Sequence, residues 1–232
     1  MPLPHSTDVW IIPLDTGDPA RDEARVPELG AYERERLRRL GDSDTHGAGR
    51  EGRGQRSRRR YLAAHLAARD IVAGYLDCAP ADLTHVRNAL RGKPGYVLGW
   101  CPGPAVSLSR SGDLALLAVR AADSVVGVDV ERVRPGIDWL RVLGRPYPDP
   151  ADAFRAWTRL EATVKASGLG LAAGVGSDLT RWSATDVTLP QPYEGYAAAV
   201  ATDRAEATAA PVRIRPHSEH MQHEFRRTVT LP

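Results

Sequence analysis

Residues 124–133 restrict most strongly what this chain can fold into, because valine and acidic residues alternate along them. β-Branched residues favour strands, and successive side chains of a strand point to opposite faces. A strand here therefore carries valine on one face and Gly127, Asp129 and Glu131 on the other. Carboxylates two residues apart lie roughly 7 Å from each other and repel unless a cation such as Mg2+ lies between them. The alternative is a strand with a solvated acidic edge.

Residues 152–166 carry apolar side chains at helical spacing and have glycine just beyond their end, a pattern that predicts a helix. Glu161 and Lys165 are four residues apart and share one face of that helix. Alone, such a pair is an ordinary ion pair worth about 0.2–0.5 kcal/mol. Beside an acidic strand it indicates a site for a cation and a phosphate. An apolar stripe anchors the helix and consists of Phe154, Trp157 and Val164.

Strand-forming and helix-forming segments follow the same coarse order in both halves of the chain, which predicts an α+β fold with two related lobes. Further strands are expected over residues 9–14, 106–109, 114–119, 196–200 and 212–214. Further helices are expected over residues 28–40 and 57–76, the second capped by Ser57. Turns are expected at 92–95 and 111–113, a mobile loop at 41–54, and a linker from 134 to 149.

Composition narrows the class of protein further. The chain has 232 residues, 42% of them hydrophobic, which suffices to bury a sizeable core. A net charge of +2 does not make it a polycation, so its partner need not be nucleic acid. Cys78 and Cys101 show neither metal-ligand spacing nor a disulfide framework. No basic leader followed by an apolar run and no membrane-spanning length of apolar residues occur, so we expect a cytoplasmic protein without a membrane partner.

Together the acidic strand and the helix resemble the paired signature of the Sfp-type 4′-phosphopantetheinyl transferase superfamily. The first part is Gly-x-Asp-x-Glu at residues 127–131, and the second is Trp-Thr-x-x-Glu-Ala-x-x-Lys-Ala-x-Gly-x-Gly-Leu at residues 157–171. Residues 60–69 resemble the arginine-bearing helix of the family, Gly92-Lys93-Pro94 its Gly-Lys-Pro turn, and residues 107–112 its Asn-x-Ser-His-Ser-Gly segment. These matches run in order over most of the chain.

The resemblance implies a fold and a reaction. Two similar α/β lobes would be arranged about a pseudo-twofold axis, with residues 1–122 contacting coenzyme A and residues 123–232 carrying the Mg2+ and catalytic groups and a polar C-terminal tail. The reaction would transfer 4′-phosphopantetheine from coenzyme A to a serine of an acyl or peptidyl carrier protein and release 3′,5′-ADP. Fatty-acid, polyketide and nonribosomal-peptide biosynthesis all use this chemistry. We expect a monomer.

The resemblance also assigns roles to residues. Asp129, Glu131 and Glu161 would coordinate Mg2+ together with the pyrophosphate of coenzyme A. Glu161 would also serve as the base for the serine hydroxyl, directly or through a water. Lys165 would neutralise the phosphate and assist departure of 3′,5′-ADP. The residues that match coenzyme A contacts of the family are Arg60, Lys93, Ser109, Arg110 and Lys165.

Three departures from the family pattern leave a second interpretation open. Arg110 stands where histidine is usual, Leu160 replaces a lysine, and residues 132–153 lack the Phe-Ser-x-x-Glu-like stretch that helps contact the carrier. The alternative is a non-catalytic member that binds coenzyme A or a carrier protein. A third alternative, nucleic-acid binding through the basic residues 50–60, lacks interleaved aromatic residues, so we expect no nucleic-acid partner. We expect Arg34 and Arg36 to be solvated surface charges.

Overall fold

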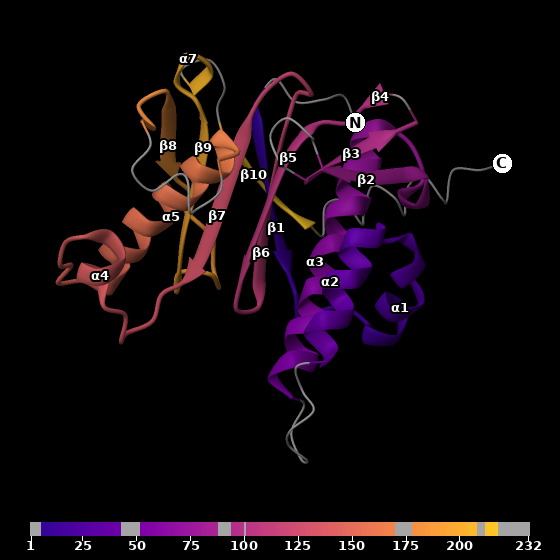
Figure 1. Cartoon of the computed structure of the whole chain (residues 1–232), viewed down its shortest axis with the longest axis horizontal. Coiled ribbons are helices and arrows are strands. Elements are labelled where there is room, and N and C mark those ends of the chain that lie inside the picture. The colour runs from indigo at the N-terminus through magenta and orange to yellow at the C-terminus, as the bar shows by residue number, and fades with distance from the viewer. Residues whose placement is uncertain are drawn as a thin grey trace.

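The computed structural model describes residues 6–42, 52–87, 94–99, 101–169, 178–207 and 212–217. It confirms an α+β fold built on one four-stranded and two three-stranded sheets (Figure 1). The elements up to the centre of the chain are β1 (Thr7–Pro13), α1 (Pro19–Ala24), the 3-10 turn η1 (Val26–Glu28), α2 (Ala31–Asp42), α3 (Arg53–Leu76), the 3-10 turn η2 (Pro80–Asp82), β2 (Leu83–Arg87), β3 (Pro94–Leu98), β4 (Cys101–Pro102), β5 (Ala105–Ser111) and β6 (Leu114–Arg120). The remaining elements are β7 (Val126–Arg132), α4 (Trp139–Leu143), α5 (Pro150–Ser167), β8 (Trp182–Asp186), β9 (Tyr196–Asp203), α7 (Arg204–Ala207) and β10 (Val212–Pro216).

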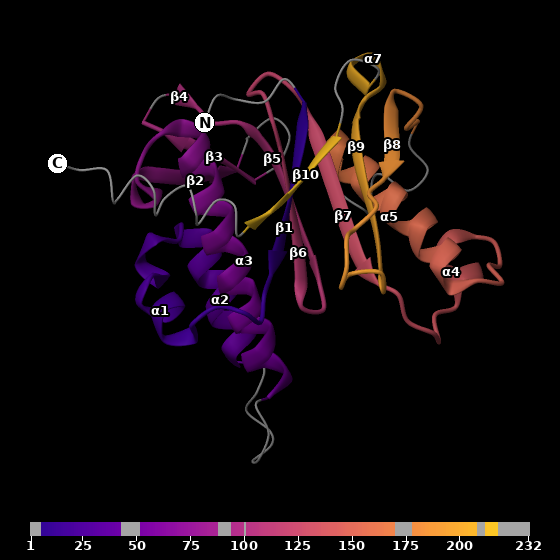
Figure 2. The same ribbon diagram turned by 180° about the vertical axis from the view of Figure 1, so that it is seen from behind.

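The four-stranded sheet has the order β10-β1-β6-β5 and joins the two ends of the chain. β1 runs antiparallel to β6 and parallel to β10, with Thr7 opposite Val212 (Figure 2). The pairing of β1 and β10 is strengthened by charge, because Arg213 Nε and Arg215 Nε donate to the buried Asp8 at 2.8 and 3.0 Å. The last strand therefore completes a sheet that begins with the first.

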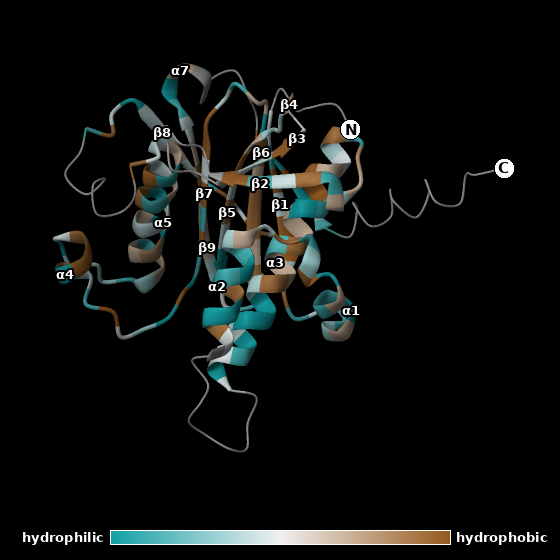
Figure 3. Cartoon of the chain, turned by 45° about the vertical axis from the view of Figure 1, so that its right-hand side comes forward, coloured by the Kyte–Doolittle hydropathy of each residue, from teal (hydrophilic) through white to brown (hydrophobic). Residues whose placement is uncertain are grey.

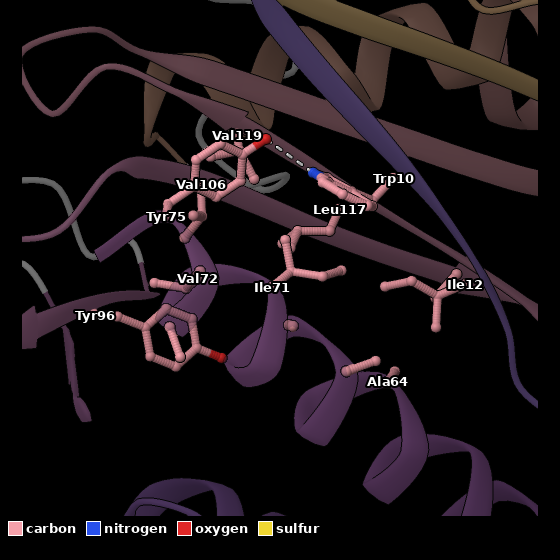
Figure 4. Close-up of a cluster of buried hydrophobic side chains, with 14 of the residues drawn as sticks. Trp10, Ile12, Ala64, Ile71, Val72, Tyr75, Tyr96, Val106, Leu117 and Val119 are labelled. Carbon is pink, nitrogen blue, oxygen red and sulfur yellow. Dashed lines mark hydrogen bonds between the residues drawn. The ribbon is translucent and has the colours of Figure 1, made fainter. Parts of the chain in front are cut away.

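Helix α3 covers one face of the four-stranded sheet, and its apolar side chains fill the space between them. Ile71 and Val72 pack among Trp10 and Leu117 of the sheet, and Trp10 Nε1 donates to Tyr75 Oη at 3.1 Å (Figure 4). Burying a side chain such as Ile71 fully contributes roughly 1.5–3 kcal/mol. Hydrophobic strands at the centre contrast with the hydrophilic helix α2 on the outside (Figure 3).

The other face of the same sheet packs against the β7-β9-β8 sheet. The valines of β7 bury here, since Val126, Val128 and Val130 share a cluster with Val9 and Leu116. The far side of β7 and β9 is covered by α5 through small residues, and Gly127 permits the closest approach. A Cβ at Gly127 would lie 2.0 Å from the carbonyl oxygen of Ala162. The layers thus run helix, sheet, sheet, helix, with the acidic face of β7 turned toward α5.

Several predicted elements are confirmed in place. β7 and α5 lie where the alternation and the helical spacing put them, as do β1, β9 and β10. The predicted pair at residues 106–119 is the antiparallel hairpin β5–β6, closed at Ser111 and Leu114 with Gly112 at a φ of 59°. A left-handed residue at this turn favours glycine.

Other boundaries were wrong. α2 begins at Ala31, three residues after the predicted start at residue 28, because residues 26–28 form the 3-10 turn η1. α3 begins at Arg53, so Ser57 lies inside the helix and Gly52 takes the N-cap position. The predicted mobile loop at 41–54 therefore includes the last residues of α2 and the start of α3, while 43–51 lie outside the described residues.

The predicted linker also contains a helix. α4 is capped by Asp138, whose side chain accepts from the Arg141 amide at 3.2 Å, and it buries Trp139. α5 is capped by Asp149 and begins at Pro150, earlier than the expected Asp152. Of the predicted turn at 92–95, the last two residues belong to β3 and the others lie outside the described residues. None of the described helices combines the length and the apolar character needed to cross a membrane.

Candidate active site

Strand β7 and helix α5 place the predicted acid and base groups against each other. Asp129 lies at the middle of β7 with its side chain 2% exposed, on the face opposite the valines. Glu161 and Lys165 project from adjacent turns of α5 toward it, and their side chains are 15% and 31% exposed. The site is therefore an acidic strand face that the helix covers, except where Lys165 reaches solvent.

Lys165 is the centre of the contacts in this site. Its Nζ lies 2.6 Å from Asp129 Oδ1, 2.9 Å from Ser109 Oγ and 3.7 Å from Glu161 Oε2. Ser109 Oγ in turn donates to Asp129 Oδ1 at 2.7 Å. One ammonium thus offsets part of the charge of the buried carboxylate, and four of the predicted site residues meet at one point.

Glu131 lies at the edge of this group. Its Oε2 accepts from Ser111 Oγ at 2.7 Å and lies 3.5 Å from Arg134 Nη1. Its side chain is 23% exposed, so it borders the solvent. Among the described residues, no three acidic, histidine or cysteine side chains converge tightly enough to hold a metal ion as they stand.

The electrostatics of the site act most strongly on Glu161. Burial and then the neighbouring charge of Asp129 raise the pKa of Glu161 to about 7, while Lys165 acts in the opposite direction. A carboxyl group with a pKa near neutrality is suited to accept a proton at physiological pH. The site thus places a carboxyl group of raised pKa beside the ammonium of Lys165.

The carboxylate oxygens of the site are of the kind that a magnesium ion binds. Asp129 Oδ2 is buried and has no hydrogen-bond partner among the described residues, whereas a protonated Glu161 would donate to Asp129. With Glu161 ionised, this oxygen is available to a cation. Mg2+ is usually bound by one or two carboxylates together with water and phosphate, so a three-acid cluster is not required. Asp129 and Glu161 are the two carboxylates beside Lys165, and Glu131 lies at the more exposed edge of the group.

Arginine side chains lie on the other side of β5. Arg110 is half-buried, with its guanidinium 5.5 Å from the centre of the Tyr61 ring, and it has no carboxylate partner among the described residues. Burial, together with the nearby charges of Arg36 and Arg60, lowers the pKa of Arg110. Arg60 on α3 is engaged by Asp15, whose Oδ1 accepts from its Nε at 2.8 Å. A half-buried cation without a counter-ion is suited to bind an anionic group of a ligand.

The remaining basic residues named from the sequence are one predicted coenzyme A contact, Lys93, and two predicted surface charges, Arg34 and Arg36. Lys93 lies outside the described residues. Arg34 and Arg36 are exposed, as expected, and Arg34 donates to the carbonyl oxygen of Leu29.

Comparison with known proteins supports the family resemblance. HetI of Nostoc, a 4′-phosphopantetheinyl transferase, is 30% identical to this chain over 187 residues, which cover 73% of this chain and 72% of HetI. The chain belongs to the 4′-phosphopantetheinyl transferase superfamily. A Synechocystis protein whose name places it with these transferases is 28% identical over 142 residues, or 53% of this chain and 57% of that relative. No family model matches the chain.

In this member of the transferase superfamily, the structure shows the surroundings of one departure from the family pattern, at position 160. Leu160 replaces the usual lysine and is partly buried on α5. The neighbouring Arg159 does not supply the missing charge to the site, because its Nε donates to Asp186 at 2.7 Å.

Sequence reasoning missed how β5 contributes to the site. Three serines, at positions 107, 109 and 111, point from β5 toward β7, and each has a partner there. The signal that could have found them was the spacing of hydroxyl side chains two residues apart on a strand.

Proposed function

We propose that this chain transfers 4′-phosphopantetheine from coenzyme A to a serine of an acyl or peptidyl carrier protein and releases 3′,5′-ADP. The observation that carries the proposal is the contact of Lys165 with Asp129 and Glu161, which combines a cation-binding oxygen, a base and a phosphate-binding ammonium. Membership of the superfamily supports the same reaction.

Asp129 and Glu161, with Glu131 at the rim, are the residues that would hold Mg2+. When bound, the ion offsets the charge that builds up on the pyrophosphate oxygens during phosphoryl transfer. Glu161 takes the proton from the carrier serine, directly or through a water, as the serine oxygen attacks phosphorus. The phosphorus–oxygen bond to 3′,5′-ADP breaks, and Lys165 neutralises the departing phosphate.

Arg60, Lys93 and Arg110 bind the phosphates and nucleotide of coenzyme A in this proposal. The half-buried Arg110 supports it, because a guanidinium without a carboxylate partner can take a phosphate at any physiological pH. Arg60 must exchange Asp15 for the ligand. Lys165 joins this set, and the resemblance alone adds Ser109.

We further propose the wider setting. Residues 1–122 and 123–232 form two lobes related by a pseudo-twofold axis, the protein is a cytoplasmic monomer, and its carrier belongs to a fatty-acid, polyketide or nonribosomal-peptide system. Strand β10 crosses from the second lobe to pair with β1 of the first.

The test is labelling of apo-carrier proteins with fluorescent coenzyme A and Mg2+. Glu161→Ala, which removes the base, should lower the labelling rate at least about 100-fold, the scale of positioned proton transfer. Asp129→Ala, which removes a metal ligand, should abolish labelling. Circular dichroism and thermal unfolding would verify that each variant folds. Asp186→Asn, which removes a surface partner of Arg159, is the matched control and should label normally. Undiminished labelling by either alanine variant would overturn the proposal.

A non-catalytic member that binds coenzyme A or a carrier protein is the second candidate. It is favoured by Leu160 and by the absence of a tight three-acid cluster among the described residues. Incubation with coenzyme A, Mg2+ and a panel of apo-carriers followed by intact mass distinguishes the two. A mass gain of one phosphopantetheine group eliminates the second candidate.

A further inference from the structure

Strands β5 and β7 lie side by side although they belong to different sheets. β5 pairs with β6, and β7 pairs with β9, and no backbone ladder joins β5 to β7 in the described part of the chain. Serine hydroxyls make the connection. Ser107 Oγ accepts from the Val128 amide at 3.0 Å, while Ser109 and Ser111 donate to carboxylates of β7.

The hydroxyl of Ser109 settles which oxygen of Asp129 is free. Oδ1 accepts from Ser109 Oγ at 2.7 Å and from Lys165 Nζ at 2.6 Å. Oδ2 is buried and has no partner among the described residues. Two donors on one oxygen fix the rotation of the carboxylate and leave the other oxygen for a cation.

The hydroxyl of Ser111 likewise helps to fix the orientation of the Glu131 carboxylate. Ser111 Oγ donates to Glu131 Oε2 at 2.7 Å and accepts from the Arg132 amide at 3.1 Å. The hydroxyl is therefore held by the backbone of β7, and its hydrogen is directed at the carboxylate. The orientation of Glu131 is set by β5 as well as by its own strand.

We propose that Ser109 and Ser111 are positioning residues that orient Asp129 and Glu131 toward a divalent cation. This proposal gives the hydroxyl of Ser109 to the metal ligand Asp129 in place of the coenzyme A contact that the resemblance implies. The proposal rests on the proposed function, because it takes the cation to be bound by these carboxylates. Groups that hold metal ligands in place typically account for 10- to 100-fold in metal affinity.

The experiment measures Mn2+ binding to the full chain without coenzyme A, by electron paramagnetic resonance of free Mn2+. Ser109→Ala should bind Mn2+ about 10- to 100-fold more weakly than wild type, and Ser111→Ala about 10-fold more weakly. Ser109→Thr keeps the hydroxyl and should restore affinity. Ser107→Ala is the matched control, since Ser107 and Ser109 lie on the same strand face and are both 8% exposed. It should bind within about twofold of wild type, because its hydroxyl touches no carboxylate.

A second measurement separates the two roles of Ser109. Calorimetric titration of coenzyme A without metal should give the same dissociation constant for Ser109→Ala and wild type. If Ser109→Ala loses coenzyme A affinity and keeps Mn2+ affinity, the hydroxyl belongs to the nucleotide site and the proposal is overturned.

The remaining outcomes are equally decisive. Equal losses of Mn2+ affinity in Ser107→Ala and Ser109→Ala would show that the contact between strands matters, not the carboxylate, and would overturn the proposal. Should Ser109→Ala fail to fold, the Ser111→Ala and Ser109→Thr titrations carry the test. Wild-type protein that binds no Mn2+ would refute the metal step of the proposed function, whereas normal binding by wild type and by both alanine variants refutes this inference alone.

Discussion

Lys165 Nζ lies 2.6 Å from Asp129 Oδ1, so an ion pair fixes the last turns of α5 to the centre of β7. A buried carboxylate that loses its counter-ion is strongly destabilising, commonly by about 3–5 kcal/mol. The pair therefore holds together the two elements that carry the site, in addition to any part in the reaction.

Removing Lys165 should thus destabilise the fold. We expect Lys165→Met to lower the free energy of unfolding by about 3 kcal/mol, near the low end of that range because the lysine is partly exposed. Urea unfolding at pH 8 measures it. Adding Asp129→Asn to Lys165→Met should recover much of the loss, since the unpaired charge is gone. Additive losses in the double variant would show that the two side chains are not coupled.

The stability of the metal-free protein should depend on pH through Glu161. Its pKa is raised from 4.5 to about 7 in the fold, so between these values the native state holds more protons than the unfolded chain. Stability therefore falls as pH rises through this window, by on the order of 3 kcal/mol at about 1.4 kcal/mol per pKa unit. Unfolding in EDTA at pH 5 and pH 8 tests this. Glu161→Gln should remove most of the decline, and a Gln variant with the wild-type slope would contradict the assignment.

Gly127 should not tolerate a side chain. An alanine Cβ would meet the backbone of α5, 2.0 Å from Ala162 O and 2.5 Å from Ala166 N, so the helix must move away. We expect Gly127→Ala to cost about 1–3 kcal/mol or more and to reduce carrier labelling, because Lys165 and Glu161 move with the helix. Gly195→Ala is the control, since its Cβ meets nothing within 4 Å. Equal thermal midpoints for the two variants would refute the close contact.

Because Arg110 keeps its charge at physiological pH, the side chain at position 110 should add no pH dependence to coenzyme A binding. The wild-type guanidinium stays charged at physiological pH, whereas a histidine loses its charge as pH rises through about 6.5. In Arg110→His we expect the dissociation constant for coenzyme A to rise about tenfold more than in wild type between pH 6 and pH 8. Isothermal titration measures both proteins. Arg110→Lys should bind more weakly than wild type but without the added pH dependence, and matching pH profiles for His and Arg would remove Arg110 from the phosphate site.

Asp15 should compete with the ligand for Arg60. The pair is partly exposed, with side chains 20% and 37% exposed, so its strength is about 0.2–1 kcal/mol. Asp15→Asn should therefore tighten coenzyme A binding by up to about fivefold. Glu23→Gln frees Arg58 on the same helix in the same way, but Arg58 is not a predicted contact. Tightening in both variants would indicate a general effect of charge, and tightening in neither would place Arg60 outside the site.

The parts of the site set by local pattern could be predicted from the sequence. Alternation defined the acidic face of β7, and the i,i+4 spacing defined the acid-base face of α5. The approach of β5 to β7 could not be predicted, because it depends on the packing of two separate sheets. Arg60 was expected to contact coenzyme A, and its ion pair with Asp15, 45 residues away in the sequence, could not be predicted.

The same division applies to the fold. Long amphipathic segments such as α3 were found. The start of α3 lies four residues before its apolar pattern, because its first turn is arginine-rich and largely exposed to solvent. α4 has five residues, which is too few for a periodic signal. The parallel pairing of β10 with β1 leaves no local trace, since its partners lie about two hundred residues apart.

The separation of β1 and β10 along the sequence matters during synthesis, because β10 is made long after β1. Asp8 and its partner Arg213 are separated by 205 residues, so a ribosome adding about 5–20 residues each second needs roughly 10–40 s between them. Throughout this interval one edge of β1 has no neighbour, and an open edge can recruit a foreign strand. All residues of the proposed catalytic centre are therefore synthesised before β10, the edge strand that pairs with β1.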